Sequence, residues 1–357
     1  MSIKDQIKQQ DKADMWSAVK GCPEQIKQIV GDYSDWTPQQ PLMTPRKVLF
    51  VGMGGSAIGG DLVRVWAEKV APVPMTVLRS YTVPHWVDDS TLVLASSYSG
   101  DTEETLAAVE QAADKGGRIV AVASGGQLAK LAAASGWDYI QIPGGLQPRA
   151  AIGYSLAATV MIMVKFQLFP TSVLEELDLG SQIMAAEGEQ WGDPDRDGNE
   201  ALEVATFIAK RLPIIYGSVA TTEALAIRLR GQLAENSKLL ASHHLLPEQN
   251  HNEIVGLAER INDIGDPIII WLLDEEDHAR VKLRQDLAGR LIGAREAAPS
   301  SSPWECSLAG SGTSLIQRNL SLLHRIDWVS YYTALLRGYD PSAIEILTRL
   351  KAEMKQS

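Results

Sequence analysis

The sequence predicts an α/β protein made of two subdomains, each a mostly parallel sheet flanked by helices. In the first half, short aliphatic runs alternate with segments of helical periodicity, which is typical of βαβ units. The polar, breaker-rich stretch 192–199 then predicts a linker. After it, Leu212–Ser218 followed by a helix mirrors Val48–Ser56 followed by a helix, which indicates a weak internal duplication.

These patterns divide the chain into a lead-in at 1–45, a first subdomain at 46–192 and a second at 193–357. We expect strands near 47–52, 74–79, 91–96, 118–123 and 139–142, then near 213–217, 267–273 and 304–308. We expect helices near 57–69, 102–116, 126–135, 150–169, 172–190, 199–211, 219–238, 277–294, 313–337 and 341–354.

Bulk composition excludes several classes of protein. The 357 residues carry a formal net charge of −11, which argues against a nucleic-acid or acidic-membrane partner. The two cysteines, Cys22 and Cys306, lie far apart and suit a reducing cytoplasm. The longest apolar run, 156–169, is too short and too polar to span a bilayer, and it predicts a core helix. The N-terminus lacks the apolar core of a signal peptide.

Two polar loops follow predicted strands and point to a phosphorylated ligand. One is Gly52-Met53-Gly54-Gly55-Ser56, and the other is Ser97-Tyr98-Ser99-Gly100-Asp101-Thr102. In a parallel sheet such loops lie side by side at the carboxyl ends of the strands, where ligands bind. Backbone N–H groups and hydroxyls at helix N-termini hold a phosphate without a cation, so we expect Gly55, Ser56, Ser97, Ser99 and Thr102 to bind one.

Other interpretations of these loops stay open from pattern alone. The first loop also fits a GxGxx(G/A) dinucleotide fingerprint, and Arg79 at the end of the next strand could accept the 2′-phosphate of NADP. It could equally be a tight turn that needs glycine. In the second loop, Asp101 and Glu104 have the spacing of a capping box, which leaves the hydroxyls unexplained.

Three charged residues occupy unusual helical positions. Arg149 opens a predicted helix and Glu235 closes one, and both oppose the helix dipole. Lys351 falls on the apolar stripe of a C-terminal helix that we expect to start at Asp340 (N-cap) and Pro341 (N1). Each also has a simpler interpretation: Arg149 in solvent, Glu235 on the surface paired with nearby Lys238, and Lys351 snorkelling.

Three of the six histidines lie between Ser242 and Asn252. The adjacent His243 and His244 should diverge, and no metal-ligand spacing is met, so we predict no metal site. His251 lies in 247–253, a predicted polar loop where it could reach a ligand and act in acid–base chemistry.

Together these motifs resemble the sugar isomerase (SIS) fold, and more closely the bifunctional phosphoglucose/phosphomannose isomerase family. The matching segments occur in family order, and the ordered set is more specific than any member. They are Val51-Gly52-Met53-Gly54-Gly55-Ser56, Ser97–Thr105, Pro148-Arg149-Ala150-Ala151, Glu235-Asn236-Ser237-Lys238, Pro247–Glu253 and Ile346–Lys351. The lead-in is not covered by the resemblance.

The resemblance implies two flavodoxin-like SIS subdomains and an aldose–ketose isomerase that interconverts fructose 6-phosphate with glucose 6-phosphate and mannose 6-phosphate. It implies that Glu235 carries the C1–C2 proton through a cis-enediol(ate), that Arg149 stabilises this intermediate, and that His251 and Lys351 open the sugar ring. It implies no cofactor. It also implies a homodimer in which His251 is donated across the interface.

Three alternatives accompany this prediction. A sugar-phosphate-binding SIS regulatory module without catalysis would need a DNA-binding segment, and the lead-in is short and not basic. A transaminating synthase would need an ammonia-supplying domain. An NADP oxidoreductase would use the first loop as its dinucleotide fingerprint, and absence of nicotinamide binding would dismiss it.

Overall fold

The computed structural model describes residues 2–260, 266–293 and 304–354. The first sheet contains β1 (Lys47–Val51), β2 (Met75–Leu78), β3 (Thr91–Ser96), β4 (Arg118–Ala123) and β5 (Asp138–Gln141), in the order β2-β1-β3-β4-β5. The second contains β6 (Leu212–Ser218), β7 (Ser242–Leu246), β8 (Pro267–Leu273) and β9 (Glu305–Ala309), in the order β7-β6-β8-β9. Each neighbouring pair is parallel.

The helices surround these sheets. Those before the linker are α1 (Ile3–Gln10), α2 (Met15–Lys20), α3 (Cys22–Asp32), α4 (Gly54–Val70), α5 (Glu103–Asp114), α6 (Gly126–Ser135), the 3₁₀ turn η1 (Pro148–Ala150), α7 (Ile152–Lys165) and α8 (Ser172–Trp191). Those after it are α9 (Glu200–Ile208), α10 (Glu223–Glu235), the 3₁₀ turn η2 (Glu248–His251), α11 (Glu253–Arg260), α12 (Ala279–Gly293), α13 (Leu315–Leu336) and α14 (Glu345–Met354).

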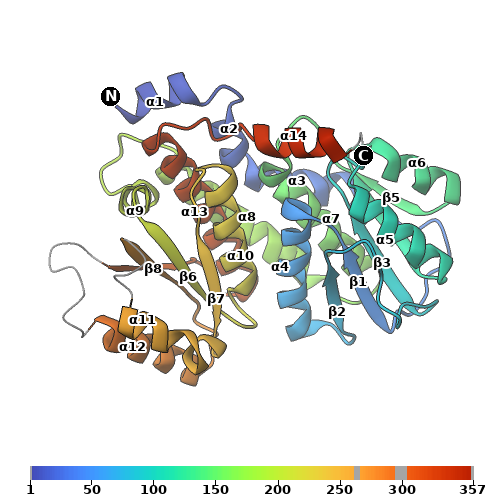
Figure 1. Cartoon of the computed structure of the whole chain (residues 1–357). Helices are drawn as coiled ribbons and strands as arrows, with labels where there is room; N and C mark the ends of the chain where they lie inside the picture. The colour runs from blue at the N-terminus through green and yellow to red at the C-terminus, as the bar shows by residue number, and fades with distance from the viewer. Residues whose placement is uncertain (1, 261–265, 294–303, 355–357) are drawn as a thin grey trace.

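The predicted duplication is confirmed by the strand orders. The run β2-β1-β3-β4 in the first sheet matches β7-β6-β8-β9 in the second. Figure 1 shows the two sheets on either side of a central layer of helices that includes α4, α7, α8, α10 and α13. The two-subdomain α/β prediction is therefore correct. The boundary at residue 192 stays a prediction, because α8 on its first side packs against α13 on its second.

Strand alternation divides the hydrophobic residues between two layers. Val48 and Phe50 of β1 face the large core that contains the central helices, whereas Leu49 and Val51 face α5 and α6. Both faces of the strand are buried because helices cover both sides of the sheet. This explains why the predicted strands appear in the sequence as continuous apolar runs.

The sequence analysis did not predict β7. Its residues are Ser-His-His-Leu-Leu, and only Leu246 is fully buried. As the edge strand it pairs with β6 alone, so four of its five side chains remain partly exposed and polar residues are tolerated. A strand without an apolar run therefore forms through backbone pairing.

The lead-in braces the turn that carries Arg149. The Gln25 amide on α3 is buried; it donates to Ala150 O at 2.8 Å and accepts from Gly153 N at 3.1 Å. These bonds satisfy backbone groups on both sides of the junction between η1 and α7. Within the described residues, no helix is long and apolar enough to cross a membrane.

Gln25→Ala tests this brace. The variant leaves a buried carbonyl and a buried N–H without partners, so we expect stability to fall by about 1–3 kcal/mol. The measurement is the thermal unfolding midpoint. The matched control is Gln28→Ala on the exposed side of α3, and equal midpoints for both variants would contradict a bracing role.

Candidate active site

Arg149 lies in a short 3₁₀ turn instead of the first turn of α7, which begins at Ile152. The prediction that it opens the helix, or lies in solvent, is therefore wrong: the side chain is only 3% exposed. Gly55 permits this arrangement, because a Cβ there would lie 3.0 Å from both the Arg149 Cα and the Pro148 carbonyl oxygen. The glycine loop thus lies directly against the arginine turn.

The Arg149 guanidinium joins three segments. Its Nε donates to Asn236 Oδ1 at 2.5 Å, and its Nη1 lies 3.3 Å from Glu235 Oε2. Its Nη2 donates to the carbonyls of Pro341 and Ser342 at 2.7 and 3.2 Å. Burial lowers its pKa, and nearby Glu235 opposes that shift.

Glu235 ends α10, and its side chain is 34% exposed. The expectation of a surface pair with Lys238 is wrong, because the Lys238 Nζ instead donates to the backbone carbonyls of Asp340 and Asn236 at 2.6 and 3.2 Å. The fixed cation beside the Glu235 carboxylate is Arg149, which comes from the other half of the chain.

Glu235 and Arg149 line one cavity of about 240 Å³. Its lining residues are Gly54, Gly55, Ile58, Arg79, Arg149, Ile227, Arg228, Arg230, Gly231, Gln232 and Glu235. Four arginines line the cavity with one carboxylate, although Arg79 and Arg228 are also paired with acids outside the lining. This arginine-rich lining suits an anionic ligand although the whole chain is acidic. Sequence analysis did not single out Arg228 or Arg230, because each lies on an ordinary amphipathic helix.

Two of these arginines already have partners within the protein, and one of them, Arg79, is the residue that the dinucleotide interpretation needs for the 2′-phosphate of NADP. Arg79 is paired with the buried Asp61 carboxylate, and Arg228 donates to Asp327 and to the Arg149 carbonyl.

A larger cavity of about 720 Å³ lies between α12 and β9, but its lining contains none of the predicted site residues. Its size therefore does not make it the better candidate.

The two polar loops meet at the carboxyl ends of β1 and β3, as predicted for neighbouring parallel strands. Ser56 Oγ accepts a hydrogen bond from Tyr98 N at 3.3 Å, and the Ser97 and Thr102 hydroxyls lie 2.8 Å apart. Ser56 and Ser97 are buried, whereas Ser99 is exposed and accepts from the backbone of its own loop.

The predicted capping box at the start of α5 is wrong. Thr102 is the N-cap and makes no side-chain capping bond. The Asp101 carboxylate turns away and accepts from Gln127 N at 2.9 Å, at the start of α6. Asp101 therefore joins two helices and leaves the loop hydroxyls available for a ligand.

His251 lies in η2, beyond the carboxyl end of β7, and is exposed. Glu235 lies before β7, at the end of a helix that returns from the carboxyl edge of the sheet to its amino edge. His251 is not among the residues that line the described cavity containing Glu235. The predicted polar loop at 247–253 consists of η2 and the first residue of α11.

The nearby histidines form no metal site. His244 Nε2 lies 3.1 Å from Glu253 Oε1, and burial lowers the pKa of His243. Within the described residues, no three His, Cys, Asp or Glu side chains cluster closely enough to hold a metal ion.

The prediction for the C-terminal helix is wrong in two respects. The helix α14 starts at Glu345, not after Asp340, and it buries none of its side chains, so Lys351 lies on an exposed helix. The carbonyls of residues 340–342 accept bonds from Lys238 and Arg149. These carbonyls therefore accept from side chains, whereas in a helix they would accept from the N–H groups of the following turn.

Comparison with known proteins shows the family of the chain. The SIS domain model matches residues 42–138, and the model of the bacterial phospho-glucose isomerase C-terminal SIS domain matches residues 197–354. A bifunctional phosphoglucose/phosphomannose isomerase from Caldicellulosiruptor bescii is 37% identical over 343 residues, covering 96% of this chain and 99% of that protein. The chain belongs to this family.

One further relative supports the family assignment, and one solved structure supports the fold. A bifunctional phosphoglucose/phosphomannose isomerase from Aquifex aeolicus is 33% identical, covering 93% of this chain and 99% of that protein. The C-terminal domain of glucosamine-fructose-6-phosphate aminotransferase from Francisella tularensis has a TM-score of 0.74 at 15% identity. This likeness covers 93% of this chain and 98% of that structure, and it concerns the fold alone.

The surroundings of Lys238, which the sequence did not reveal, lead to a testable prediction. Burial, together with the nearby Arg149 charge, lowers its pKa from 10.5 to about 8. Between these two pH values the unfolded chain binds the proton more often than the folded chain. Stability therefore rises with pH across this window in the wild type, and Lys238→Met removes the rise.

The measurement is the unfolding midpoint of wild type and Lys238→Met between pH 7 and 10. The control is Lys210→Met at an exposed position. Parallel pH curves for wild type and Lys238→Met would contradict the lowered pKa.

Proposed function

We propose that the protein is an aldose–ketose isomerase that interconverts fructose 6-phosphate with glucose 6-phosphate and mannose 6-phosphate through a cis-enediol(ate). The observation that carries the proposal is the Glu235 carboxylate, held 3.3 Å from a buried guanidinium in a cavity lined by the glycine loop. Moving a proton between adjacent carbons needs one base and one fixed positive charge beside the developing enediolate. Glu235 and Arg149 are suited to these two roles.

The phosphate would lie at the carboxyl ends of β1 and β3. Ser56, Ser97, Ser99 and Thr102 provide hydroxyls there, and the N-terminus of α4 provides backbone N–H groups. The phosphate group would then anchor the sugar with C1 and C2 toward the Glu235 carboxylate. The chemistry requires no cofactor, since the proton leaves one carbon and returns to the next.

Curated relatives favour catalysis over the regulatory alternative. The relatives from Caldicellulosiruptor bescii and Aquifex aeolicus, which span most of this chain, are named as enzymes of this reaction. A binding module also has no need of a carboxylate paired with a guanidinium inside the ligand cavity.

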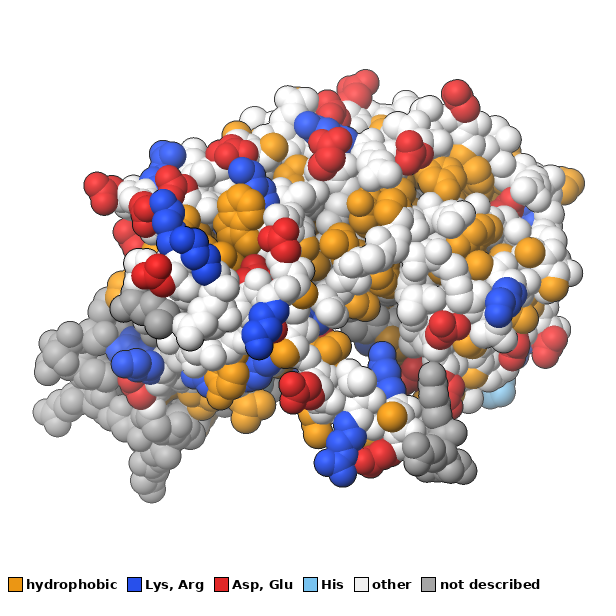
Figure 2. Space-filling model, turned by 90° about the horizontal axis from the view of Figure 1, so that it is seen from above, with side chains coloured by type: hydrophobic (Ala, Val, Ile, Leu, Met, Phe, Trp, Pro, Cys, Tyr) orange, Lys and Arg blue, Asp and Glu red, His pale blue; other side chains and the backbone are white. Residues whose placement is uncertain are grey.

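A homodimer would complete the site. His251 and Lys351, the proposed ring-opening residues, do not line the described cavity that contains Glu235. The helix α14 exposes large hydrophobic side chains, with Ile346 75% and Leu350 53% exposed. Figure 2 looks onto the face that carries α14 in Figure 1 and shows hydrophobic side chains gathered on it. A second copy would cover such a surface. Because α11, which follows His251, lies at the opposite end of the subunit from α14 in Figure 1, donation of His251 to Glu235 of a partner would need contacts beyond this face.

Glu235→Gln tests the base. An amide cannot accept the carbon-bound proton, so we expect the rate of isomerisation to fall by about 10²–10⁴-fold. The measurement starts from fructose 6-phosphate and follows glucose 6-phosphate and mannose 6-phosphate separately by coupled assays. The exposed Glu203→Gln on α9 is the control and should keep wild-type rates. Retention of both activities in Glu235→Gln would disprove the assignment of the base.

Mixing two inactive variants tests donation across the interface. Glu235→Gln and His251→Ala subunits, refolded together, form hybrid dimers with one intact site. Because half of randomly mixed dimers are hybrids, about a quarter of wild-type activity should return. No recovery above the separate variants would place His251 and Glu235 of each site on the same chain, or remove His251 from the reaction.

A further inference from the structure

The two subdomains build equivalent loop pairs at the carboxyl ends of equivalent strands. β1 and β6 each occupy the second place in their sheets, and β3 and β8 the third. In the first subdomain the paired loops precede α4 and α5. In the second they are 219–222, before α10, and 274–278, before α12. Each pair therefore forms a cradle of hydroxyls and helix N-termini, the setting in which proteins hold oxyanions.

In the first cradle no carboxylate occupies the space between the loops. The Ser97 and Thr102 hydroxyls bond one another at 2.8 Å. The loop contains an acid, Asp101, but its carboxylate turns outward and accepts from Gln127 N on α6. The hydroxyls of the first cradle can therefore turn toward an external anion.

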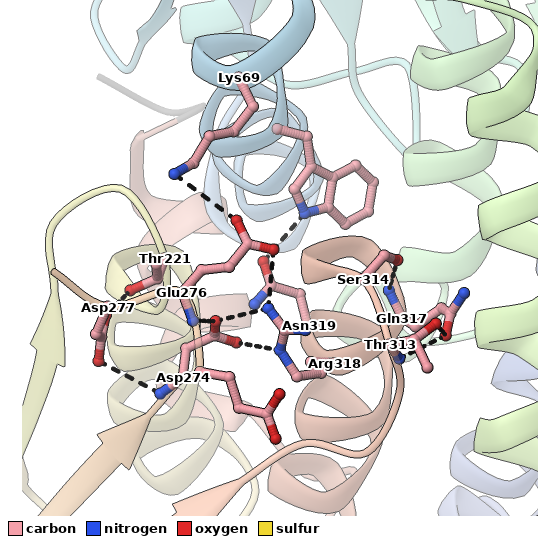
Figure 3. Close-up of polar contacts among 12 residues, drawn as sticks. Lys69, Thr221, Asp274, Glu276, Asp277, Thr313, Ser314, Gln317, Arg318 and Asn319 are labelled. Carbon is pink, nitrogen blue, oxygen red and sulfur yellow. Dashed lines mark hydrogen bonds and ion pairs between the residues drawn. The ribbon is translucent and has the colours of Figure 1, made fainter. Parts of the chain in front are cut away.

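In the second cradle the equivalent loop has no hydroxyl and four acids, of which Asp277 points inward. The Asp277 carboxylate accepts from Ser218 Oγ at 3.0 Å, from Thr221 Oγ1, and from Asp274 N at 3.3 Å. Figure 3 shows Asp277 between Thr221 and Asp274. The residue is only 6% exposed, so its carboxylate lies within the protein and is held by donors from both loops.

Among the residues that the structure describes, no charged side chain forms an ion pair with this carboxylate. Arg318, the nearest guanidinium in Figure 3, donates to Asp274 at 2.8 and 3.0 Å and to Glu276 at 3.0 Å. Lys69 of the first subdomain lies 3.8 Å from Glu276. Burial raises the pKa of Asp277, against the effect of its hydroxyl and N–H donors. These dipolar donors are therefore the contacts that hold the carboxylate in place.

We propose that the second cradle is a binding site for a small oxyanion that the chain closes with its own Asp277 carboxylate. Two hydroxyls and a backbone N–H around one carboxylate are the donor types that the first cradle offers to a phosphate. The internal carboxylate fixes the β6 and β8 loops, and it leaves each chain with a single open cradle for an anionic ligand.

Chemical rescue tests the proposal. Asp277→Ala removes the carboxylate and leaves the donors facing an empty space, so the unfolding midpoint should fall. Sodium formate or inorganic phosphate should then raise it in a saturable manner, by roughly 2 °C at tenfold excess over the Kd for a chain of this length. Asp277→Asn is the matched control, since its side chain fills the same space and should exclude the added anion. The wild-type protein in the same salts gives the general effect of salt on the unfolding midpoint.

The readout is unfolding, so it does not depend on whether the chain turns over sugar phosphates. If formate and phosphate raise the midpoint of Asp277→Ala no more than that of Asp277→Asn, the proposal is overturned. If Asp277→Ala does not fold in chloride buffer, its refolding yield in formate is compared with its yield in chloride. A higher yield in formate supports the proposal, and equal yields overturn it.

Discussion

The buried Arg149 guanidinium is the interaction on which the geometry of the candidate site depends. Removing a cation from water costs several kcal/mol unless acceptors surround it. Here the acceptors are the Asn236 amide, the Glu235 carboxylate and the carbonyls of Pro341 and Ser342. Because these acceptors lie after α10 and before α14, satisfying one side chain brings three distant segments together. The proposed base is thereby fixed beside its cation.

Residues on two sides of the Arg149 turn help to hold it in position. Gly55 lacks the Cβ that would collide with the arginine turn, so the glycine loop and the arginine belong to one structural unit. From the other side, Gln25 satisfies the backbone next to that turn, which gives the lead-in a structural role that its sequence did not indicate. The hydrophobic side chains of α14 remain exposed, and we expect a second subunit to bind there.

The two subdomains share a fold but differ in the loops at the carboxyl ends of their strands. Both halves use the same strand order, and both place hydroxyl-bearing loops at the same ends of the strands. The loops after β3 and β8 differ: the first has one acid, Asp101, which points away from its cradle, whereas the second has four, of which Asp277 points into its cradle. A difference in one loop can thus leave one of two similar folds open to a ligand while the other is filled from within.

The sequence by itself determined the strands buried on both faces, the duplication and the loops at the strand ends, because hydrophobic periodicity and glycine placement are local signals. It also placed Arg149 and Glu235 among the unusual charges. Only the tertiary structure decided that these two meet, that β7 forms at the sheet edge and that α14 starts at Glu345. Each of these depends on partners distant in the chain: an acceptor for a buried cation, a neighbouring strand, and donors that occupy carbonyls. Local periodicity carries no information about such partners.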